Sequence, residues 1–154
     1  MKIIIVSHGD FANGILSAAN MIVGDKDSVK TVSLKPLDSP DSLKERIIKN
    51  IADEDNDYII FTDIPYGTPY NVVCSLTRDY KFEHFSGINL AILLDAILSK
   101  DTMSSNDFIK KIENNINDYF MNPGNILKDI DNDSLCMEDV FLWEILFYAG
   151  LTID

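Results

Sequence analysis

Runs of apolar residues alternate with stretches of helical spacing along most of this chain. Residues 3–6 are apolar at every position, a pattern typical of a strand buried on both faces of a parallel sheet. Residues 58–62 repeat that pattern, whereas residues 29–34 alternate polar and apolar side chains and predict a less buried strand. Residues 82–87 form a short fourth candidate. The pattern therefore predicts four strands, of which the first and third are central.

Helical spacing follows each predicted strand. Apolar residues recur every three or four positions in residues 11–22, 43–51, 72–79, 89–99 and 107–119. Typical end signals accompany them: Gly24 as a C-cap, Ser39 and Thr68 as N-caps, and Pro40 and Pro69 at first helical positions. This alternation predicts an α/β fold, an open and mostly parallel sheet with helices on both faces. Right-handed crossovers give the strand order 2-1-3-4.

Two side chains that could take part in a reaction lie at the ends of the two central strands. His8 ends the first strand and Asp63 ends the third. In the order 2-1-3-4 the chain reverses direction between strands one and three, which creates a crevice at their carboxyl ends. We therefore expect His8 and Asp63 to face the same crevice, although 55 positions separate them.

These residue types suit transfer of a phosphoryl group. A neutral imidazole is a nucleophile near neutral pH, and a carboxylate on one ring nitrogen fixes its tautomer and balances developing positive charge. Candidates for holding the phosphoryl group are Gly9, Gly67 and Thr68, which lie at helix starts where anions are favoured. No Walker loop, metal-binding carboxylate cluster or cofactor motif is recognisable. A metal-free phosphohistidine fits better than nucleotide hydrolysis, and His84 is given a structural role.

Charge and composition limit the kinds of binding partner and the cellular location that we expect for this chain. The net charge of −12 disfavours nucleic acid and anionic membranes, and it is most negative over residues 101–154. That acidic end suits a solvated face or docking to a basic partner. No apolar run approaches the roughly 20 residues that span a bilayer, and no signal peptide precedes the first strand. Cys74 and Cys136 form no metal or redox motif, so we expect a cytoplasmic protein.

The C-terminal end has a different pattern. We expect a single domain over residues 1–154, with its core in about 1–121, a loop near residues 122–133 and an apolar segment at 137–151. That segment is apolar on nearly every face, so periodicity does not distinguish strand from helix. Docking its aromatic side chains is worth several kcal/mol at roughly 25 cal/mol per Å². It is therefore expected to pack, either on its own subunit or on a partner.

Three motifs carry a resemblance to a known family. They read Val6-Ser7-His8-Gly9-Asp10-Phe11-Ala12-x-Gly14, then Thr62-Asp63-x-x-x-Gly67-Thr68-Pro69-Tyr70-Asn71, then Ser86-Gly87-Ile88-Asn89-Leu90-Ala91-Ile92-Leu93-Leu94-Asp95. In this order they resemble the enzyme IIA components of the mannose-type (mannose/fructose/sorbose) sugar phosphotransferase system. The resemblance covers about residues 1–120.

The resemblance implies roles for particular residues. The histidine matching His8 accepts a phosphoryl group from the phosphocarrier HPr and passes it to a IIB component. The aspartate matching Asp63 orients that imidazole, and the residue matching Thr68 lines the phosphate pocket. The resemblance also implies a homodimer in which a C-terminal strand crosses to the other subunit's sheet, with residues 137–151 as the candidate.

One departure from the family pattern concerns the pocket rim, because Tyr66 stands where the family usually has a glycine and follows Pro65. An alternative function keeps the fold: a regulatory phosphoprotein, or a phosphoryl donor subunit of the kind that serves dihydroxyacetone kinases. The motif around Gly9 and Asp10 favours the sugar branch. A receiver domain phosphorylated on aspartate is disfavoured, because it needs paired acids after the first strand. The sequence does not identify the sugar.

Overall fold

Four parallel strands form one sheet in the residues described by the computed structural model, which are 1–24, 29–51, 56–120 and 122. The strands are β1 (Lys2–His8), β2 (Val29–Leu34), β3 (Tyr58–Thr62) and β4 (Glu83–Ser86). Their order is β2-β1-β3-β4, which confirms the predicted order 2-1-3-4. Central β1 pairs with both neighbours, so that Ile5 lies opposite Thr31 on β2 and Phe61 on β3.

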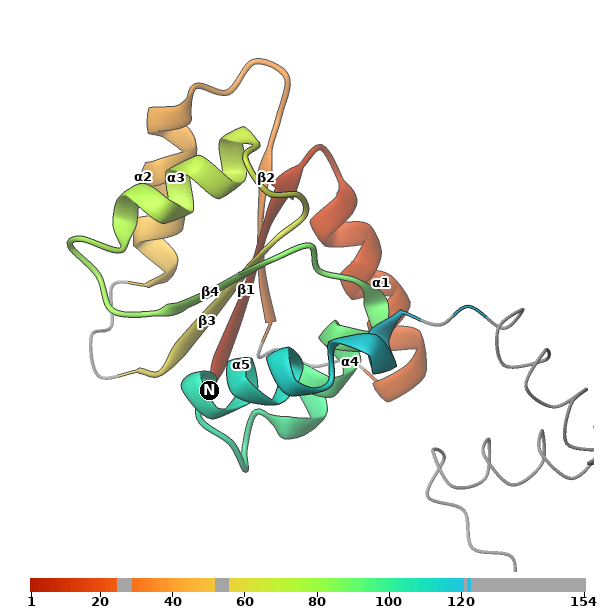
Figure 1. Ribbon diagram of the computed structural model, residues 1–154. Helices are drawn as coiled ribbons and strands as arrows, with labels where there is room; N and C mark the ends of the chain where they lie inside the picture. The colour runs from red at the N-terminus through yellow and green to blue at the C-terminus, as the bar shows by residue number, and fades with distance from the viewer. Residues whose placement is uncertain (25–28, 52–55, 121, 123–154) are drawn as a thin grey trace, which may run out of the picture. The chain divides into compact units, whose positions relative to one another are not determined.

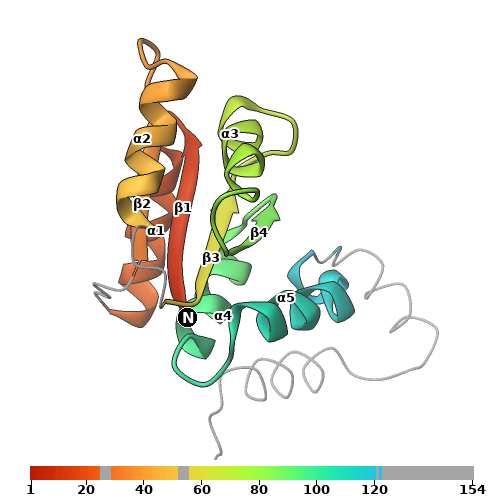
Figure 2. The same cartoon turned by 90° about the vertical axis from the view of Figure 1, so that its left-hand side faces the viewer.

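Helices cover both faces of this sheet (Figures 1 and 2). The helices are α1 (Phe11–Val23), α2 (Pro40–Asn50), α3 (Thr68–Leu76), α4 (Leu90–Ser99) and α5 (Ser105–Asn114), followed by the 3-10 turn η1 (Ile116–Tyr119). Helices α2 and α3 pack on one face, and α1, α4 and α5 on the other. This arrangement confirms the predicted α/β architecture. None of the helices among the described residues is long and apolar enough to cross a membrane.

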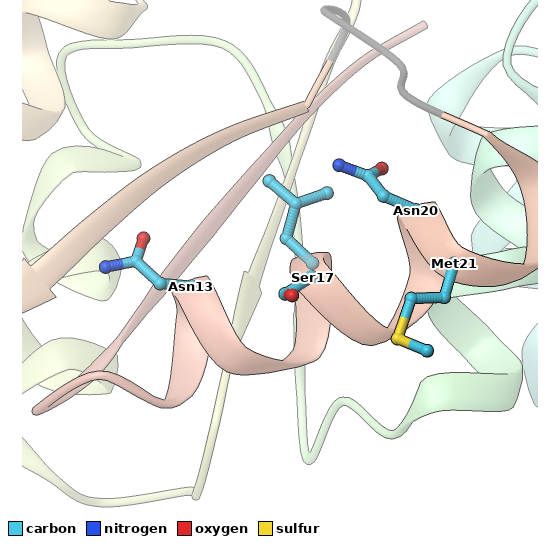
Figure 3. Close-up of a pocket in the computed structure, with 5 residues that line it drawn as sticks. Asn13, Ser17, Asn20 and Met21 are labelled. Carbon is cyan, nitrogen blue, oxygen red and sulfur yellow. The ribbon is translucent and has the colours of Figure 1, made fainter.

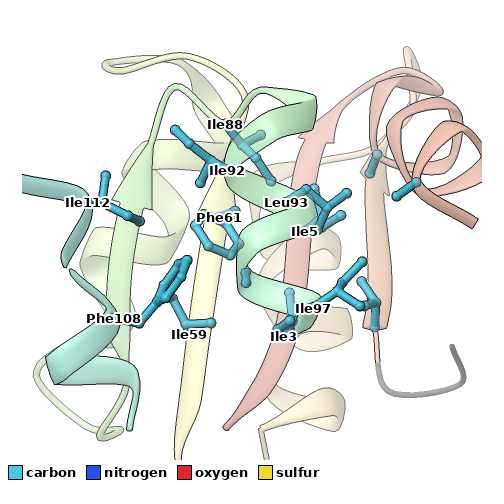
Figure 4. Close-up of a cluster of buried hydrophobic side chains, with 14 residues drawn as sticks. Ile3, Ile5, Ile59, Phe61, Ile88, Ile92, Leu93, Ile97, Phe108 and Ile112 are labelled. Atoms are coloured by element: carbon cyan, nitrogen blue, oxygen red, sulfur yellow. The ribbon is translucent and has the colours of Figure 1, made fainter. Parts of the chain in front are cut away.

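The strand pleat divides the core into two clusters. Ile3, Ile5, Ile59 and Phe61 point toward α1, α4 and α5, where they meet Leu93 and other buried residues (Figure 4). The alternate residues of the same strands, such as Ile4 and Ile60, point toward α2 and α3. Both central strands are buried on two faces, which explains their uninterrupted apolar sequence. A rigid, doubly covered sheet therefore holds the loops at its carboxyl edge.

Most predicted helix ends are confirmed, but both ends of α3 need correction, since this helix ends at Leu76 and not near residue 79. Ser39 accepts a hydrogen bond from the Ser42 N–H at 3.1 Å, with Pro40 as the first residue of α2. Helix α3 starts one residue earlier than predicted: Gly67 is the N-cap and Thr68 the first helical residue. The cause is the backbone of Gly67, which is extended and whose carbonyl accepts the first helical hydrogen bond, from Asn71 at 2.9 Å. The predictions of Thr68 as N-cap and of Pro69 as the first helical residue are therefore wrong.

The last predicted helix also needs correction. Helix α5 begins at Ser105 and ends at Asn114, not at residues 107 and 119. Its N-cap is Ser104, whose hydroxyl accepts a hydrogen bond from the Asp107 N–H at 3.1 Å. Residues Ile116–Tyr119 form the separate 3-10 turn. Strand β4 and helix α4 each lie within one residue of the predicted bounds.

The chain divides into a first compact unit, Met1–Tyr119, and a second unit, Phe120–Asp154. Almost all of the second unit lies outside the described residues. The predicted loop, the apolar segment at 137–151 and Cys136 therefore lie there too, and the single domain over 1–154 stays a prediction.

Candidate functional site

His8 and Asp63 meet at the carboxyl edge of the sheet, as the strand order predicts. The parallel pairing of β1 with β3 ends at Val6 and Thr62; Asp63 comes next on β3, and His8 lies two residues beyond Val6. The carboxylate oxygen Oδ2 of Asp63 lies 2.8 Å from Nδ1 of His8 and also accepts a hydrogen bond from the His8 backbone N–H at 2.9 Å. One carboxylate oxygen thus fixes both the backbone and the ring of His8.

The two side chains differ in exposure. The side chain of His8 is 44% exposed, whereas that of Asp63 is only 11% exposed. Burial raises the pKa of Asp63, but hydrogen bonds from the His8 backbone, the His8 ring and the Ile64 N–H outweigh it and leave the pKa below its ordinary value. Asp63 is therefore a carboxylate at neutral pH. An exposed imidazole supported by a buried carboxylate is an arrangement suited to nucleophilic chemistry.

Gly67 packs directly against the His8 ring. A Cβ atom at this position would lie 2.8 Å from Cε1 and 3.4 Å from Nε2 of His8. Only glycine leaves room for the ring there. Because Gly67 is the N-cap of α3, the helix begins beside the imidazole. Thr68 and Tyr70 carry N–H groups in the first turn of α3, where helices leave them without intrahelical partners, so the N-terminus of α3 favours an anion at this place.

The other predicted phosphate-pocket residue, Gly9, makes the turn after β1. It has a φ of 53°, a left-handed conformation that glycine adopts without steric cost. Its N–H donates to the Leu34 carbonyl at 2.9 Å. Gly9 thus ties the end of β1 to the end of β2, and its N–H is already engaged there.

Sequence reasoning missed Ser7. This residue is fully buried, and its hydroxyl accepts a hydrogen bond from the Ala12 N–H at 2.8 Å. The hydroxyl also donates to the His8 carbonyl at 3.3 Å. Because the N-cap Asp10 makes no side-chain cap, Ser7 satisfies the start of α1 from the preceding strand. A serine closing an otherwise apolar strand was the available signal.

Charged residues around the site are largely paired with one another. Asp10 forms an ion pair with Lys35, and hydrogen bonding and attraction from that ammonium lower the pKa of the Asp10 carboxyl. Asp38 pairs with Arg46 and accepts the Lys35 backbone N–H at 2.8 Å. The first pair joins the loop after β2 to the start of α1, and the second joins the same loop to α2.

His84 lies in a different environment, within β4. Its Nε2 is 3.0 Å from the Thr62 hydroxyl, and its Nδ1 is 3.7 Å from the Cys74 sulfur. Burial lowers the pKa of His84 to about 4, so the ring is neutral at pH 7. These contacts agree with the structural role expected for His84.

A surface hollow runs along α1 and is lined by Asn13, Leu16, Ser17, Asn20 and Met21 (Figure 3). It contains none of the predicted site residues and no titratable side chain. Across the described ranges of the chain, no group of three or more His, Cys, Asp or Glu side chains is arranged to hold a metal ion. The chemistry on the described surface therefore concentrates at His8.

The fold is an open parallel sheet, and an exposed histidine at its carboxyl edge is held by a carboxylate from the adjacent strand. The model of the family described as "PTS system fructose IIA component" matches residues 2–113. The chain belongs to this family, the mannose-type enzyme IIA components, as the three motifs predicted.

Known proteins agree with this assignment. The chain is 26% identical over 116 residues to the "PTS system fructose-specific EIIA component" of Bacillus subtilis (strain 168), covering 73% of this chain and 80% of that protein. It is 25% identical over 110 residues to the "PTS system mannose-specific EIIAB component" of Escherichia coli (strain K12), but this covers only 34% of that relative. The crystal structure of phosphotransferase system component EIIA from Streptococcus agalactiae superposes with a TM-score of 0.75 and 29% identity, covering 80% of this chain and 98% of that chain.

Proposed function

We propose that this chain is a phosphotransferase whose His8 receives a phosphoryl group from the phosphocarrier HPr and passes it to a IIB component for sugar uptake. Family membership supports a phosphoryl-transfer role in general. The particular observation that carries the proposal is the 2.8 Å contact between His8 Nδ1 and the Asp63 carboxylate. In this proposal each ring nitrogen of His8 has its own role, and the contact supports that division.

The assignment follows from hydrogen bonding. A carboxylate only accepts, so Nδ1 carries the proton and Nε2 carries the lone pair. Nε2 attacks phosphorus and forms a P–N bond, while the bond between phosphorus and the carrier breaks and its electron pair leaves with the carrier. The Nδ1 proton stays in place throughout. The positive charge that the imidazole gains is balanced by Asp63, a positioning residue that remains ionised because its pKa is low.

Gly67, Thr68 and Gly9 frame the phosphoryl group in this proposal. Gly67 leaves space beside the His8 ring, and the N–H groups in the first turn of α3 favour binding of a negatively charged group. The Thr68 hydroxyl is assigned to donate to a phosphoryl oxygen. Gly9 contributes its turn, since its N–H bonds to Leu34. The mechanism needs neither metal nor cofactor, because the phosphoryl group arrives already activated on the carrier.

Phosphate mapping tests the proposal. The protein is incubated with phosphoenolpyruvate, enzyme I and HPr, and acid-labile phosphate is located by peptide mapping. We expect one phosphorylated residue, His8, modified on Nε2, and loss of the label when a IIB protein is added. Label elsewhere, or on Nδ1, contradicts the mechanism. A label that IIB does not remove favours the alternative, a regulatory or dihydroxyacetone-kinase-type subunit.

We further infer a cytoplasmic homodimer that includes residues 137–151 in its interface. The support is the family resemblance and the edge position of β4, which pairs only with β3 among the described strands. The mass in solution is measured for the full chain and for a chain lacking residues 137–154. A dimer that becomes a monomer on deletion is expected. A soluble, still dimeric product removes the segment from the interface.

A further inference from the structure

Exposed apolar side chains gather in the loops around His8. Phe11 follows β1, Leu37 follows β2, and Ile64 and Tyr66 follow β3, and all four are exposed. Because the strands are parallel, these loops lie at the same edge of the sheet as His8. Exposed apolar side chains grouped on one surface mark interaction sites in soluble proteins.

Tyr66 stands out among these residues through its backbone. Its φ is 65°, and it is the only non-glycine residue with positive φ among those the structure describes. A bulky side chain in this left-handed region is strained relative to its ordinary conformation. The glycine usual at this position in the family would adopt it freely. The chain therefore retains a strained residue beside its reactive histidine, which is where strain tends to accompany function.

The strained conformation is held by its neighbours. The Asn71 side-chain amide donates to the Tyr66 carbonyl at 3.2 Å. The Tyr66 ring lies against the Tyr70 ring, with centroids 5.6 Å apart and planes tilted by 60°. Tyr66 is nevertheless 82% exposed. The Tyr66 ring is thus held in place by Tyr70 on one side and is exposed to solvent elsewhere, as expected for a preorganised contact residue.

Tyr66 is close enough to His8 to meet any protein that reacts there. A Cβ on the next residue, Gly67, would be 2.8 Å from the His8 ring. Adding the Cα–Cβ bond of that residue and the Cα–Cα distance across a trans peptide places the Tyr66 Cα within about 8 Å of the His8 ring. Phosphoryl transfer brings the reacting atoms to roughly 3 Å, so a carrier protein seated on His8 also covers Tyr66.

The carboxylates near this loop are paired within the chain, so apolar side chains are the main groups that the loop offers to another protein. Asp63 is bound to His8, Asp10 to Lys35, and Asp38 to Arg46. The β3–α3 loop exposes the apolar side chains of Ile64, Pro65 and Tyr66. Tyrosine is enriched among the residues that dominate protein–protein binding.

We propose that Tyr66 is a specificity-determining contact for the phosphorylated HPr that delivers the phosphoryl group to His8, its ring packing on an apolar side chain of that carrier. The inference rests on the proposed function and adds a residue for which the family pattern has no counterpart. It makes Tyr66 important for binding the donor protein and unimportant for the chemistry at Nε2. Binding and chemistry can be measured separately by comparing a protein donor, which must dock, with a small donor, which need not.

The test compares two donors on three variants. Tyr66→Gly removes the ring and the strain, Tyr66→Asn removes the ring but tolerates positive φ with its Cβ retained, and Tyr66→Phe keeps the ring. The large donor is phospho-HPr and the small donor is phosphoramidate, which needs no docking surface. Met21→Ala, which alters an exposed side chain on the outer face of α1 (Figure 3), is the matched control.

We expect Tyr66→Gly and Tyr66→Asn to raise the KM for phospho-HPr about tenfold with kcat nearly unchanged, the loss typical of one binding hot spot. Tyr66→Phe and Met21→Ala keep the KM of the unchanged protein. With phosphoramidate all variants react at the same rate. Because glycine and asparagine both accept positive φ, two independent variants guard against a folding defect.

Several outcomes overturn the inference. An unchanged KM for phospho-HPr removes Tyr66 from the donor contact. An equal loss with phosphoramidate makes Tyr66 a positioning residue for His8. A raised KM for IIB alone assigns Tyr66 to the acceptor, and an altered mass in solution assigns it to a contact between copies of this chain. If the unchanged protein is not phosphorylated on His8 by either donor, the proposed function itself fails and the inference falls with it.

Discussion

The two histidines of the chain lie on two strands of the same sheet, β1 and β4, with β3 between them, and they differ in almost every property that matters for chemistry. His8 ends β1, is nearly half exposed and touches a buried carboxylate. His84 lies inside β4, contacts a hydroxyl and a thiol, and has a pKa lowered to about 4 by burial. The comparison teaches that the surroundings, rather than the imidazole itself, distinguish the two residues. Access and a charge partner suit His8 to the proposed phosphoryl transfer, whereas burial suits His84 to a structural role.

The sharpest test of this comparison replaces each histidine in turn. His8→Ala is expected to abolish phosphorylation by phospho-HPr, because no other imidazole is accessible at the carboxyl edge of the described strands. His84→Ala is expected to retain it. Labelling with radioactive phosphoenolpyruvate, enzyme I and HPr measures both. Label that survives His8→Ala would end the proposed mechanism.

The carboxylate partner provides the second test. Asp63→Asn keeps the shape but removes the charge that balances the phosphorylated ring and fixes its tautomer, so the transfer rate is expected to fall on the order of 10²–10⁴-fold. Rapid-quench measurement of transfer from phospho-HPr gives the rate. Folding is checked by circular dichroism. An unchanged rate in a folded variant would show that Asp63 does not support the reaction.

The buried histidine predicts a pH dependence of stability. The pKa of His84 is 6.5 in the unfolded chain and about 4 in the folded chain. Between these pH values the unfolded chain binds a proton on His84 and the folded chain does not. The free energy of unfolding therefore falls as the pH is lowered through that window, with a contribution of about 3 kcal/mol. Urea unfolding at pH 7 and pH 4 measures it. His84→Gln should lose this part of the pH dependence, whereas the same slope in both proteins would contradict the burial argument.

Gly67 gives the smallest expected effect on transfer. Gly67→Ala places a Cβ 2.8 Å from His8 Cε1, so the ring must shift by a fraction of an ångström, and we expect transfer to slow by roughly tenfold. Gly14→Ala in α1 is the matched control, because its Cβ would meet no atom within 4 Å. The control should react normally and unfold at slightly higher urea. Equal rates for the two variants would show that the close approach at Gly67 has no function.

Much of the fold was predictable because its strands carry strong local signals. The bounds of β2 and β3 were predicted correctly, and the pairing of His8 with Asp63 followed from strand order alone. The predicted start of α3 was wrong by one residue, because threonine and glycine are about equally favoured as N-caps and the sequence does not distinguish them. What distinguishes them in the fold is the His8 ring, which leaves no space for a side chain at Gly67.

The finer features of the site were not predictable from sequence. The positive φ of Tyr66 depends on contacts with Tyr70 and Asn71. The cap that Ser7 supplies to Ala12 joins a strand residue to a helix five positions later. Both arise from side chains that meet only after the elements have packed, and no local pattern reports such meetings.

The distance in sequence between His8 and Asp63 has a consequence for a chain still being synthesised. Their hydrogen bond spans 55 positions, and it forms only after β3 has docked beside β1. His8 leaves the ribosome long before its carboxylate partner exists. Contacts so distant in sequence form slowly compared with local ones. Under the proposed function, the ability to accept a phosphoryl group is thus a property of the folded sheet. A nascent or truncated chain that carries the same histidine is expected to be a poor acceptor from the carrier protein.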